Sequence, residues 1–262
     1  MKSVLINYNM KNIKSSLVLA TSIILSVLII VAFNVIKLGT PYILTKKQNI
    51  SVKGSVSIDF TSDYIVWNGQ FYNKDLDLTK SYELMKKDKK KINDFFSTNQ
   101  INDSLVIFKS IQMKKVYKKD YKYNNDGEIV NSEDVFDGYM LSQDIIIESN
   151  DVALVERVSN EITDLIAFNV NISSKSPKYY YNGLSGLKID MIRQAGEDGL
   201  LRAKTAVNSS GGVLGSLLSA DIGVFQILGK NSNDKFSWGG TLNVLSKEKT
   251  AHVTVKQKYS IK

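Results

Sequence analysis

Hydrophobic positions are continuous near the N-terminus, where residues 15–36 read SSLVLATSIILSVLIIVAFNVI and contain no charged side chain. At a rise of 1.5 Å per residue, a helix of this length spans roughly 33 Å, about the thickness of a bilayer core. The segment is apolar on every face, is longer than the apolar region of a usual signal peptide and precedes no clear cleavage site. It therefore predicts a retained transmembrane helix over residues 15–38, with a cleaved signal peptide as the alternative.

Beyond this segment, apolar and polar positions alternate in several stretches. In residues 50–58, for example, Val52, Val56 and Ile58 alternate with polar side chains, and residues 251–261 alternate in the same way. A period of two is typical of a β-strand with one buried face. Further strands are expected over residues 64–72, 104–117, 139–148, 170–181 and 216–228.

Helical periodicity appears in three segments of the same region. Apolar residues recur at helical spacing over residues 75–96 and 187–207, and Asn150 or Asp151 is placed to cap a helix that continues to about Leu165. The polar segment 118–137 contains an Asn-Asn-Asp-Gly turn and predicts an exposed hairpin tip or loop. Strands and helices do not alternate one for one. We therefore expect an α+β fold with mostly antiparallel sheets and about three packed helices, preceded by one transmembrane helix.

The orientation of the anchor is not decided by flanking charge, because three lysines precede the apolar segment and three follow it. A short tail before the segment and a folded domain of more than 200 residues after it favour a signal anchor. Gly39 and Pro41 are expected to break the helix. The expected parts are a cytoplasmic tail (1–14), an anchor in the inner membrane (15–38), a stalk (39–49) and a periplasmic or extracytoplasmic domain (50–262).

The composition limits the chemistry that the chain can perform. It has no cysteine and a single histidine, His252, which excludes disulfides, thiolate zinc sites, iron–sulfur clusters, cysteine nucleophiles and sites that need two histidines. His252 is expected to be solvent-facing or hydrogen-bonded. Residues 223–230 superficially resemble a phosphate loop but have the wrong spacing. We therefore expect no catalytic residue, no cofactor and no metal site.

The charged residues suggest alternative functions. The net charge is +8, and lysines are concentrated at residues 86–91 and 114–122. In the second of these runs, tyrosines alternate with the lysines. We expect these runs to be solvated, with contact to anionic lipid or wall polymer as an alternative function and no nucleic-acid partner. Glu133, Asp134 and Asp137 lie close together in the sequence and offer oxygen ligands for calcium, but they do not have the spacing of an EF-hand. An envelope hydrolase is a second alternative, although no carboxylate pair can be chosen from sequence.

Small residues form a stripe on the predicted helix 187–207. Gly196, Gly199, Ala203 and Ala206 fall at positions i, i+3, i+7 and i+10. Each glycine costs roughly 1 kcal/mol relative to alanine in a helix, so close approach to another element should compensate. The stripe is a candidate for close packing, either within the chain or at an oligomer seam.

Several short motifs follow one another in a characteristic order: Val52-x-Gly54, Gly138-Tyr139, Asp198-x-x-x-Arg202-Ala203-x-x-Ala206, Trp238-Gly239-Gly240 and the segment 246–255. No single motif is specific, but in this order and spacing the chain resembles the SIMPL-domain family, the YggE-like bacterial envelope proteins, from about Ile50 to its C-terminus. It departs from the family pattern at Ser62, where proline usually precedes the aspartate, and at Gly199, where alanine is usual.

The resemblance implies an α+β fold in the bacterial envelope. Some members of the family are linked to defence against oxidative stress, others are thought to form oligomers, and the family has no established catalytic residues. Direct scavenging usually needs a thiolate, haem or redox metal, so a role in oxidative stress should be indirect here. We expect a non-enzymatic, self-associating envelope protein that contacts the bilayer through residues 15–38, forms a homo-oligomer and supports envelope integrity or oxidative-stress defence indirectly.

Overall fold

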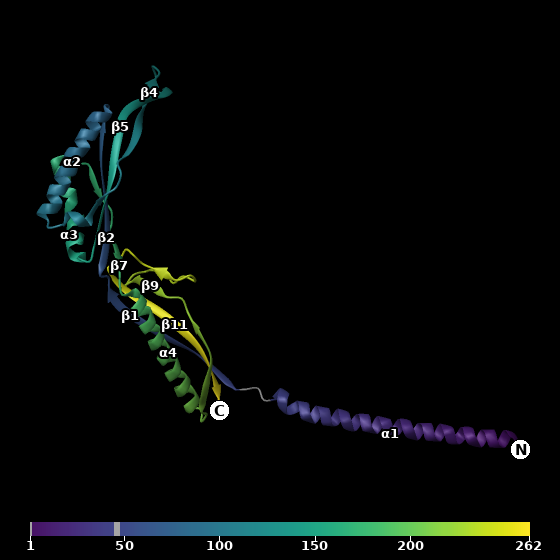
Figure 1. The fold of residues 1–262 in the computed structure, drawn as a ribbon. Coiled ribbons are helices and arrows are strands. Elements are labelled where there is room, and N and C mark those ends of the chain that lie inside the picture. Colours follow the sequence, from purple (N-terminus) through teal and green to yellow (C-terminus); the bar gives the residue numbers. More distant parts are fainter. Residues whose placement is uncertain (1, 45–47) are drawn as a thin grey trace.

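The computed structural model describes the backbone of residues 2–44 and 48–262, and the side chains of residues 16–37 and 48–262. Its helices and mostly antiparallel sheets confirm the predicted α+β class (Figure 1). Two sheets make up the folded domain. We call the one built from β1 and β8–β11 the terminal sheet, and the one built from β2–β7 the central sheet.

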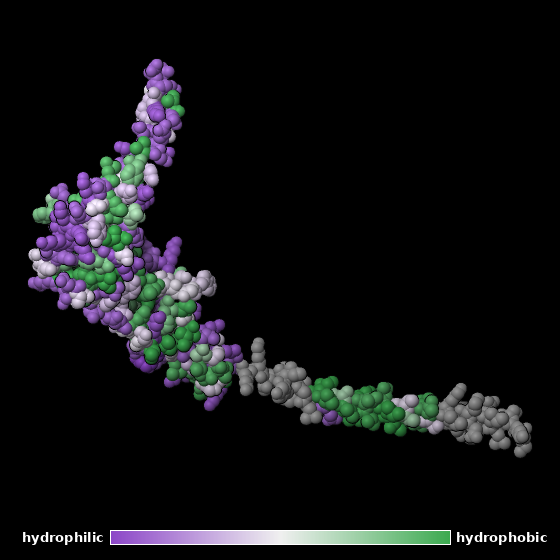
Figure 2. Space-filling model, turned by 45° about the horizontal axis from the view of Figure 1, so that its top comes forward, coloured by the Kyte–Doolittle hydropathy of each residue, from purple (hydrophilic) through white to green (hydrophobic). Residues whose placement is uncertain are grey.

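The first helix, α1 (Lys2–Leu44), contains the predicted apolar span. Within it, Ser16–Lys37 has a mean hydropathy of 2.7 and no part buried inside the protein, so it is not a core helix (Figure 2). It is long and apolar enough to cross a membrane, as an anchor or as a signal sequence.

The helix also continues through Gly39 and Pro41, so the prediction that these two residues break it is wrong. Proline removes one backbone donor, and the remaining helical hydrogen bonds carry the backbone past it. Residue 1 of the predicted tail and residues 45–47 of the predicted stalk lie outside the described residues. The boundaries of tail, anchor and stalk stay predictions.

The terminal sheet is centred on β11 (Glu248–Ile261), which pairs antiparallel with β1 (Asn49–Thr61) over the full length of β1. On its other side β11 pairs with β8 (Leu214–Ile222) and β9 (Gln226–Gly229), and β10 (Thr241–Leu242) adds a parallel pair to β9. The helix α4 (Leu184–Asn208) lies along β1 and β11 (Figure 1). The core between them forms because the alternation in both strands turns their apolar residues toward this helix.

The central sheet has the order β3-β5-β2-β6, with β4 also paired to β5 and β7 also paired to β2. Its helices, α2 and α3, pack on one face over Trp67, Phe71 and Ile145, which are fully buried. Asp151 caps α3, as predicted, through a bond from Leu154 N–H to its Oδ1 of 3.0 Å. The elements are β2 (Tyr64–Asp75), α2 (Leu78–Thr98), η1 (Asp103–Leu105), β3 (Val106–Phe108), β4 (Gln112–Tyr123), β5 (Ile129–Ser149), α3 (Val152–Glu161), η2 (Ile162–Phe168), β6 (Ile172–Ser174) and β7 (Lys178–Tyr180).

Three of the predicted strands are divided in the structure. The segments 104–117, 170–181 and 216–228 each fall on two strands instead of one. In the second case Pro177 lies between β6 and β7, and proline cannot donate a ladder hydrogen bond. The polar segment 118–137 is the distal part of a hairpin formed by β4 and β5, which confirms the hairpin alternative.

The two sheets are joined at one junction, where β1 leads directly into β2. Ser62 N–H donates to Lys247 O (3.0 Å), and Tyr179 N–H donates to Val244 O (2.7 Å). Lys247 Nζ also lies 2.8 Å from Glu156 Oε2 on α3. These contacts link the segment just before β11 with the turn between β1 and β2, with β7 and with α3.

Candidate interaction surface

A long two-stranded arm projects from the central sheet (Figure 1). It consists of β4 and the distal part of β5, residues 112–138, which we call the arm. Its tip is the predicted turn, in which Asn124 Oδ1 accepts from the backbone N–H of Asp126 (3.0 Å) and Glu128 (2.9 Å). Gly127 has φ +81°, a conformation that glycine adopts without a steric penalty. The turn at the tip of the arm is therefore formed by residues that are adjacent in the sequence.

The base of the arm is fixed by a bulge at Gly138. This residue has φ +123°, and the pairing register shifts beside it between Val116 and Tyr117. A Cβ atom at Gly138 would lie 2.6 Å from the carbonyl oxygen of Asp75, so only glycine fits. Next to it Asp137 forms an ion pair with Lys74, whose hydrogen bond lowers the pKa of the Asp137 carboxyl. The direction in which the arm leaves the sheet is thus built into the backbone.

Aromatic side chains run along the base of the arm in edge-to-face contact. The ring of Phe136 lies 5.9 Å from that of Tyr117 and 5.2 Å from that of Tyr139. Apolar and polar side chains are interspersed on the arm surface (Figure 2). Eight large apolar or aromatic side chains of the arm are between 37% and 62% exposed: Met113, Tyr117, Tyr121, Tyr123, Ile129, Val130, Val135 and Phe136. This exposure makes the arm a candidate interaction surface.

The two strands of the arm carry opposite charge. β4 contains five lysines and one acidic residue, Asp120, whereas the arm half of β5 contains Glu133, Asp134 and Asp137 and no basic residue. Lys122 Nζ lies 2.8 Å from Glu133 Oε1, and both side chains are 58% exposed. Among the described strands, β4 pairs only with β5, and residues 129–138 of β5 pair only with β4. The arm therefore presents a basic free edge and an acidic free edge.

The predicted small-residue stripe is divided between two sides of α4. The buried residues of this helix are Met191, Ala195, Gly199, Ala203 and Val207, a spacing of four. Gly199 and Ala203 therefore face the terminal sheet, while Gly196 is half-buried and Ala206 is exposed. A Cβ atom at Gly54 would lie 2.0 Å from Ala195 O and 2.5 Å from Gly199 N. The close approach at Gly199 is thus made within the chain, to β1.

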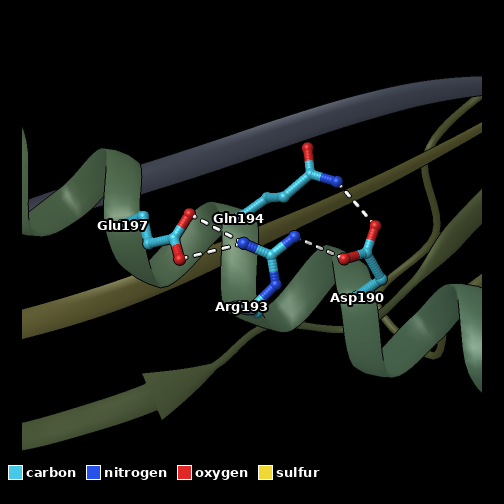
Figure 3. A network of polar contacts seen from close by, with 4 residues as sticks. All are labelled: Asp190, Arg193, Gln194 and Glu197. Atoms are coloured by element: carbon cyan, nitrogen blue, oxygen red, sulfur yellow. Dashed lines mark hydrogen bonds and ion pairs between the residues drawn. The ribbon is translucent and has the colours of Figure 1, made fainter.

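Polar side chains on the solvent-exposed side of α4 form a network of hydrogen bonds and ion pairs (Figure 3). Arg193 bridges two carboxylates, Asp190 at 2.6 Å and Glu197 at 2.9 Å. Gln194 Nε2 donates to the second oxygen of Asp190 at 2.6 Å, and the bonds from Arg193 and then Gln194 lower the pKa of Asp190. All three charged side chains are exposed, and exposed ion pairs each contribute little stability.

One carboxylate of α4 reaches the edge of β1. Asp198 Oδ2 accepts from Ser55 N–H at 2.9 Å and from Arg202 Nε at 2.8 Å. The bond from Arg202, followed by that from Ser55, lowers the pKa of Asp198. This contact occupies one backbone donor on the outer edge of β1 and so blunts that edge against pairing with another strand.

The remaining residues singled out in the sequence lie apart from one another. His252 Nδ1 is 2.9 Å from Ser57 Oγ, and its ring stacks on Phe236 at 5.3 Å, which agrees with the hydrogen-bonded alternative. Glu133 and Asp137 contact different lysines, at opposite ends of the arm. Among residues 16–37 and 48–262, no group of three His, Asp or Glu side chains is placed to hold a metal ion.

A cavity of about 560 Å³ lies between α2 and η2. Lys91, in its wall, donates from Nζ to Phe168 O at 2.9 Å. Asp94 is the one carboxylate in its wall. This cavity therefore does not contain the two facing carboxylates that glycoside hydrolysis requires.

Comparison with known families matches nearly the whole folded domain to one family model. The family model named SIMPL, described as a protein of unknown function (DUF541), matches residues 50–257. The chain belongs to the SIMPL family. The SIMPL domain begins at the second residue of β1 and ends within β11, so it includes both sheets and the arm. A comparison with curated proteins gives no match. The function of this SIMPL domain must accordingly be argued from its own geometry.

Proposed function

We propose that this chain is a non-enzymatic, membrane-anchored scaffold of the cell envelope, in which the arm of one SIMPL domain binds the arm of a neighbouring copy. Residues 15–38 anchor it in the inner membrane, residues 1–14 lie in the cytoplasm, and residues 50–262 lie on the extracytoplasmic side. The observation that carries the proposal is the arm, a projecting ribbon with exposed aromatic residues and two free edges of opposite charge.

The contact that the arm favours is strand addition. When β4 of one copy lies beside the distal part of β5 of the next, unpaired backbone groups on both edges find partners. The lysines of β4 then lie near the carboxylates of a second β5. Within the hairpin Lys119 is opposite Asp134, and Lys122 contacts Glu133 diagonally, in the same way. Exposed apolar side chains such as Tyr121 and Val130 lose contact with water at the same time.

Such a contact joins two different surfaces of the same molecule. It is therefore heterologous, and repetition leads to a closed ring or to an open filament instead of a two-fold dimer. Anchoring in one bilayer by α1 supports this association because it confines all copies to a plane and raises their effective concentration. A scaffold of this kind supports envelope integrity, and defence against oxidative stress through it, without chemistry of its own.

The experiment that tests the proposal is the mass of the full chain in non-ionic detergent, measured by light scattering after size exclusion and corrected for bound detergent. We expect a discrete multimer for the unmodified chain. Reversing charge on one strand, in Lys118→Glu with Lys122→Glu, should shift the mass toward the monomer because two acidic edges then meet.

The matched control is Lys87→Glu with Lys90→Glu, which makes the same change of charge on the exposed side of α2, away from the arm. This control should keep the multimer. A monomeric unmodified chain at all concentrations, or equal masses for both double variants, would show that the arm does not mediate self-association.

A further inference from the structure

One lysine of the terminal sheet is buried without a carboxylate partner. Lys249 lies on β11 in phase with Ala251 and Val253, and its side chain is only 2% exposed. Its Nζ donates to the backbone carbonyl of Ser246, and no ion pair within 4 Å involves it among the described residues. Lys247, two residues earlier, has such a partner in Glu156. A buried ammonium group is costly unless it is paired, so the surroundings of Lys249 need an explanation.

A small cavity lies against Lys249 at the junction of the two sheets. Its volume is about 60 Å³, and its walls are Phe60, Tyr179, Tyr180, Tyr181, Leu184, Ile227, Leu242 and Lys249. Ile227 is buried, whereas Tyr180 and Leu242 are 37% and 57% exposed, so the cavity reaches solvent beside these two residues. Lys249 supplies the one charged side chain in the wall.

The neighbouring tyrosines do not neutralise this charge. Burial, together with a hydrogen bond to Glu156, raises the pKa of Tyr179 to about 12, so its hydroxyl stays protonated near neutral pH. Burial alone lowers the pKa of Lys249, which is the direction expected when no anion is close. An ammonium group has three donors, and among the described residues one hydrogen bond from Lys249 Nζ is found, to Ser246 O.

The size and lining of the cavity define the ligand. Because a water-sized group needs about 10–15 Å³ of such volume, the cavity holds about four to six non-hydrogen atoms. A single positive charge among aromatic and aliphatic walls suits one negative charge on a short apolar chain. We propose that this cavity binds a monocarboxylate of two to four carbons, with its carboxylate on Lys249 Nζ and its chain against Leu184, Ile227 and Leu242. This site is separate from the arm and does not depend on the scaffold proposed above.

The test uses the full chain in non-ionic detergent with sodium propionate as the probe. Equal concentrations of sodium chloride and of propionamide, the neutral analogue, separate carboxylate binding from ionic strength and from apolar binding. The melting temperature should rise with propionate and not with the other two. Calorimetric titration should give at least tenfold weaker propionate binding in Lys249→Met, which keeps the length of the side chain and removes its charge.

Two further variants serve as a charge control and as a test that does not depend on Lys249. Lys256→Met removes an exposed lysine from the same strand and should bind propionate as the unmodified chain does. Leu242→Trp fills the open side of the cavity without changing charge, and should weaken binding even if Lys249→Met fails to fold. Equal effects of propionate and chloride, equal effects of propionate and propionamide, or full binding by Leu242→Trp would each overturn the proposal.

Discussion

Replacing Gly54 with alanine would place a methyl group inside the contact between β1 and α4. The added Cβ atom would lie 2.0 Å from Ala195 O, 2.5 Å from Gly199 N and 2.8 Å from Gly199 Cα. All three are backbone atoms, so no side-chain rotation relieves the overlap. Either α4 must move away from the sheet or β1 must bend.

The cost of this displacement has two parts. Overpacking costs about 1–3 kcal/mol, and rigid backbone obstacles place this case at the upper end. Moving α4 also stretches the bond from Ser55 N–H to Asp198, and bonds to charged groups contribute about 1.5–3 kcal/mol. We expect Gly54→Ala to lower the free energy of unfolding by about 4 kcal/mol. At about 2–4 °C per kcal/mol, the melting temperature of the domain falls by about 8–16 °C.

Thermal unfolding followed by circular dichroism, on the full chain in detergent, measures this change. Two alanine variants of α4 are controls. Gly186 has open space around its Cβ position, and at Gly196 the nearest atom would lie 3.6 Å away, so both substitutions should gain up to about 1 kcal/mol from helix propensity. A Gly54→Ala variant within about 1 kcal/mol of the unmodified chain would refute the close approach of the two backbones.

Two further predictions concern the edge of β1 and the base of the arm. The contacts of Asp198 lower its folded pKa, so the stability it contributes is present above the unfolded pKa of about 3.9 and is lost as the pH falls through the folded value. Asp198→Asn should therefore show a shallower loss of stability on acidification in urea unfolding from pH 5 to pH 2; equal slopes would contradict this. Gly138→Ala should cost about 1–3 kcal/mol and speed hydrogen exchange in the arm, because it combines positive φ with a clash. Gly127→Ala at the tip, with positive φ and open space, should cost less; the reverse order would contradict the role of the bulge.

Local patterns in the sequence predicted much of the fold. The alternation in residues 50–58 and 251–261 identified both long strands of the terminal sheet. The Asn-Asn-Asp-Gly turn indicated a hairpin tip or a loop, and the structure has the hairpin. These features depend on neighbours in the chain. The division of residues 170–181 could also have been expected, since Pro177 interrupts that strand.

The arm was harder to foresee. Its strands are polar because most of their side chains face water on both sides, so residues 118–137 lack the alternation that marks a half-buried strand. The register that continues β5 from the buried sheet into the arm is set by its pairing with β4. A pattern read over about ten residues does not show which strands will pair. The opposite charges of the two strands were visible in the sequence, but their free edges were not.

The burial of Lys249 could have been predicted from the sequence, although it was not. Extending the period of two backward from Ala251 places Lys249 on the core side of β11, so its burial follows from the same alternation. The small-residue stripe illustrates the converse. Steps of three residues leave Gly196 half-buried at the margin of the packed face and Ala206 exposed. Only the partner strand, with Gly54 opposite Gly199, shows which positions need to be small.

In the proposed assembly the basic strand of one arm pairs with the acidic strand of the next, and mixing two charge-reversed variants tests this pairing. One variant carries Lys118→Glu and Lys122→Glu, and the other carries Glu133→Lys and Asp134→Lys. Each variant alone should be monomeric by light scattering in detergent. An equimolar mixture should recover the mass of the unmodified multimer, because every interface then again joins a basic edge to an acidic one. A mixture that stays monomeric while the unmodified chain assembles would rule out pairing between the basic and acidic edges.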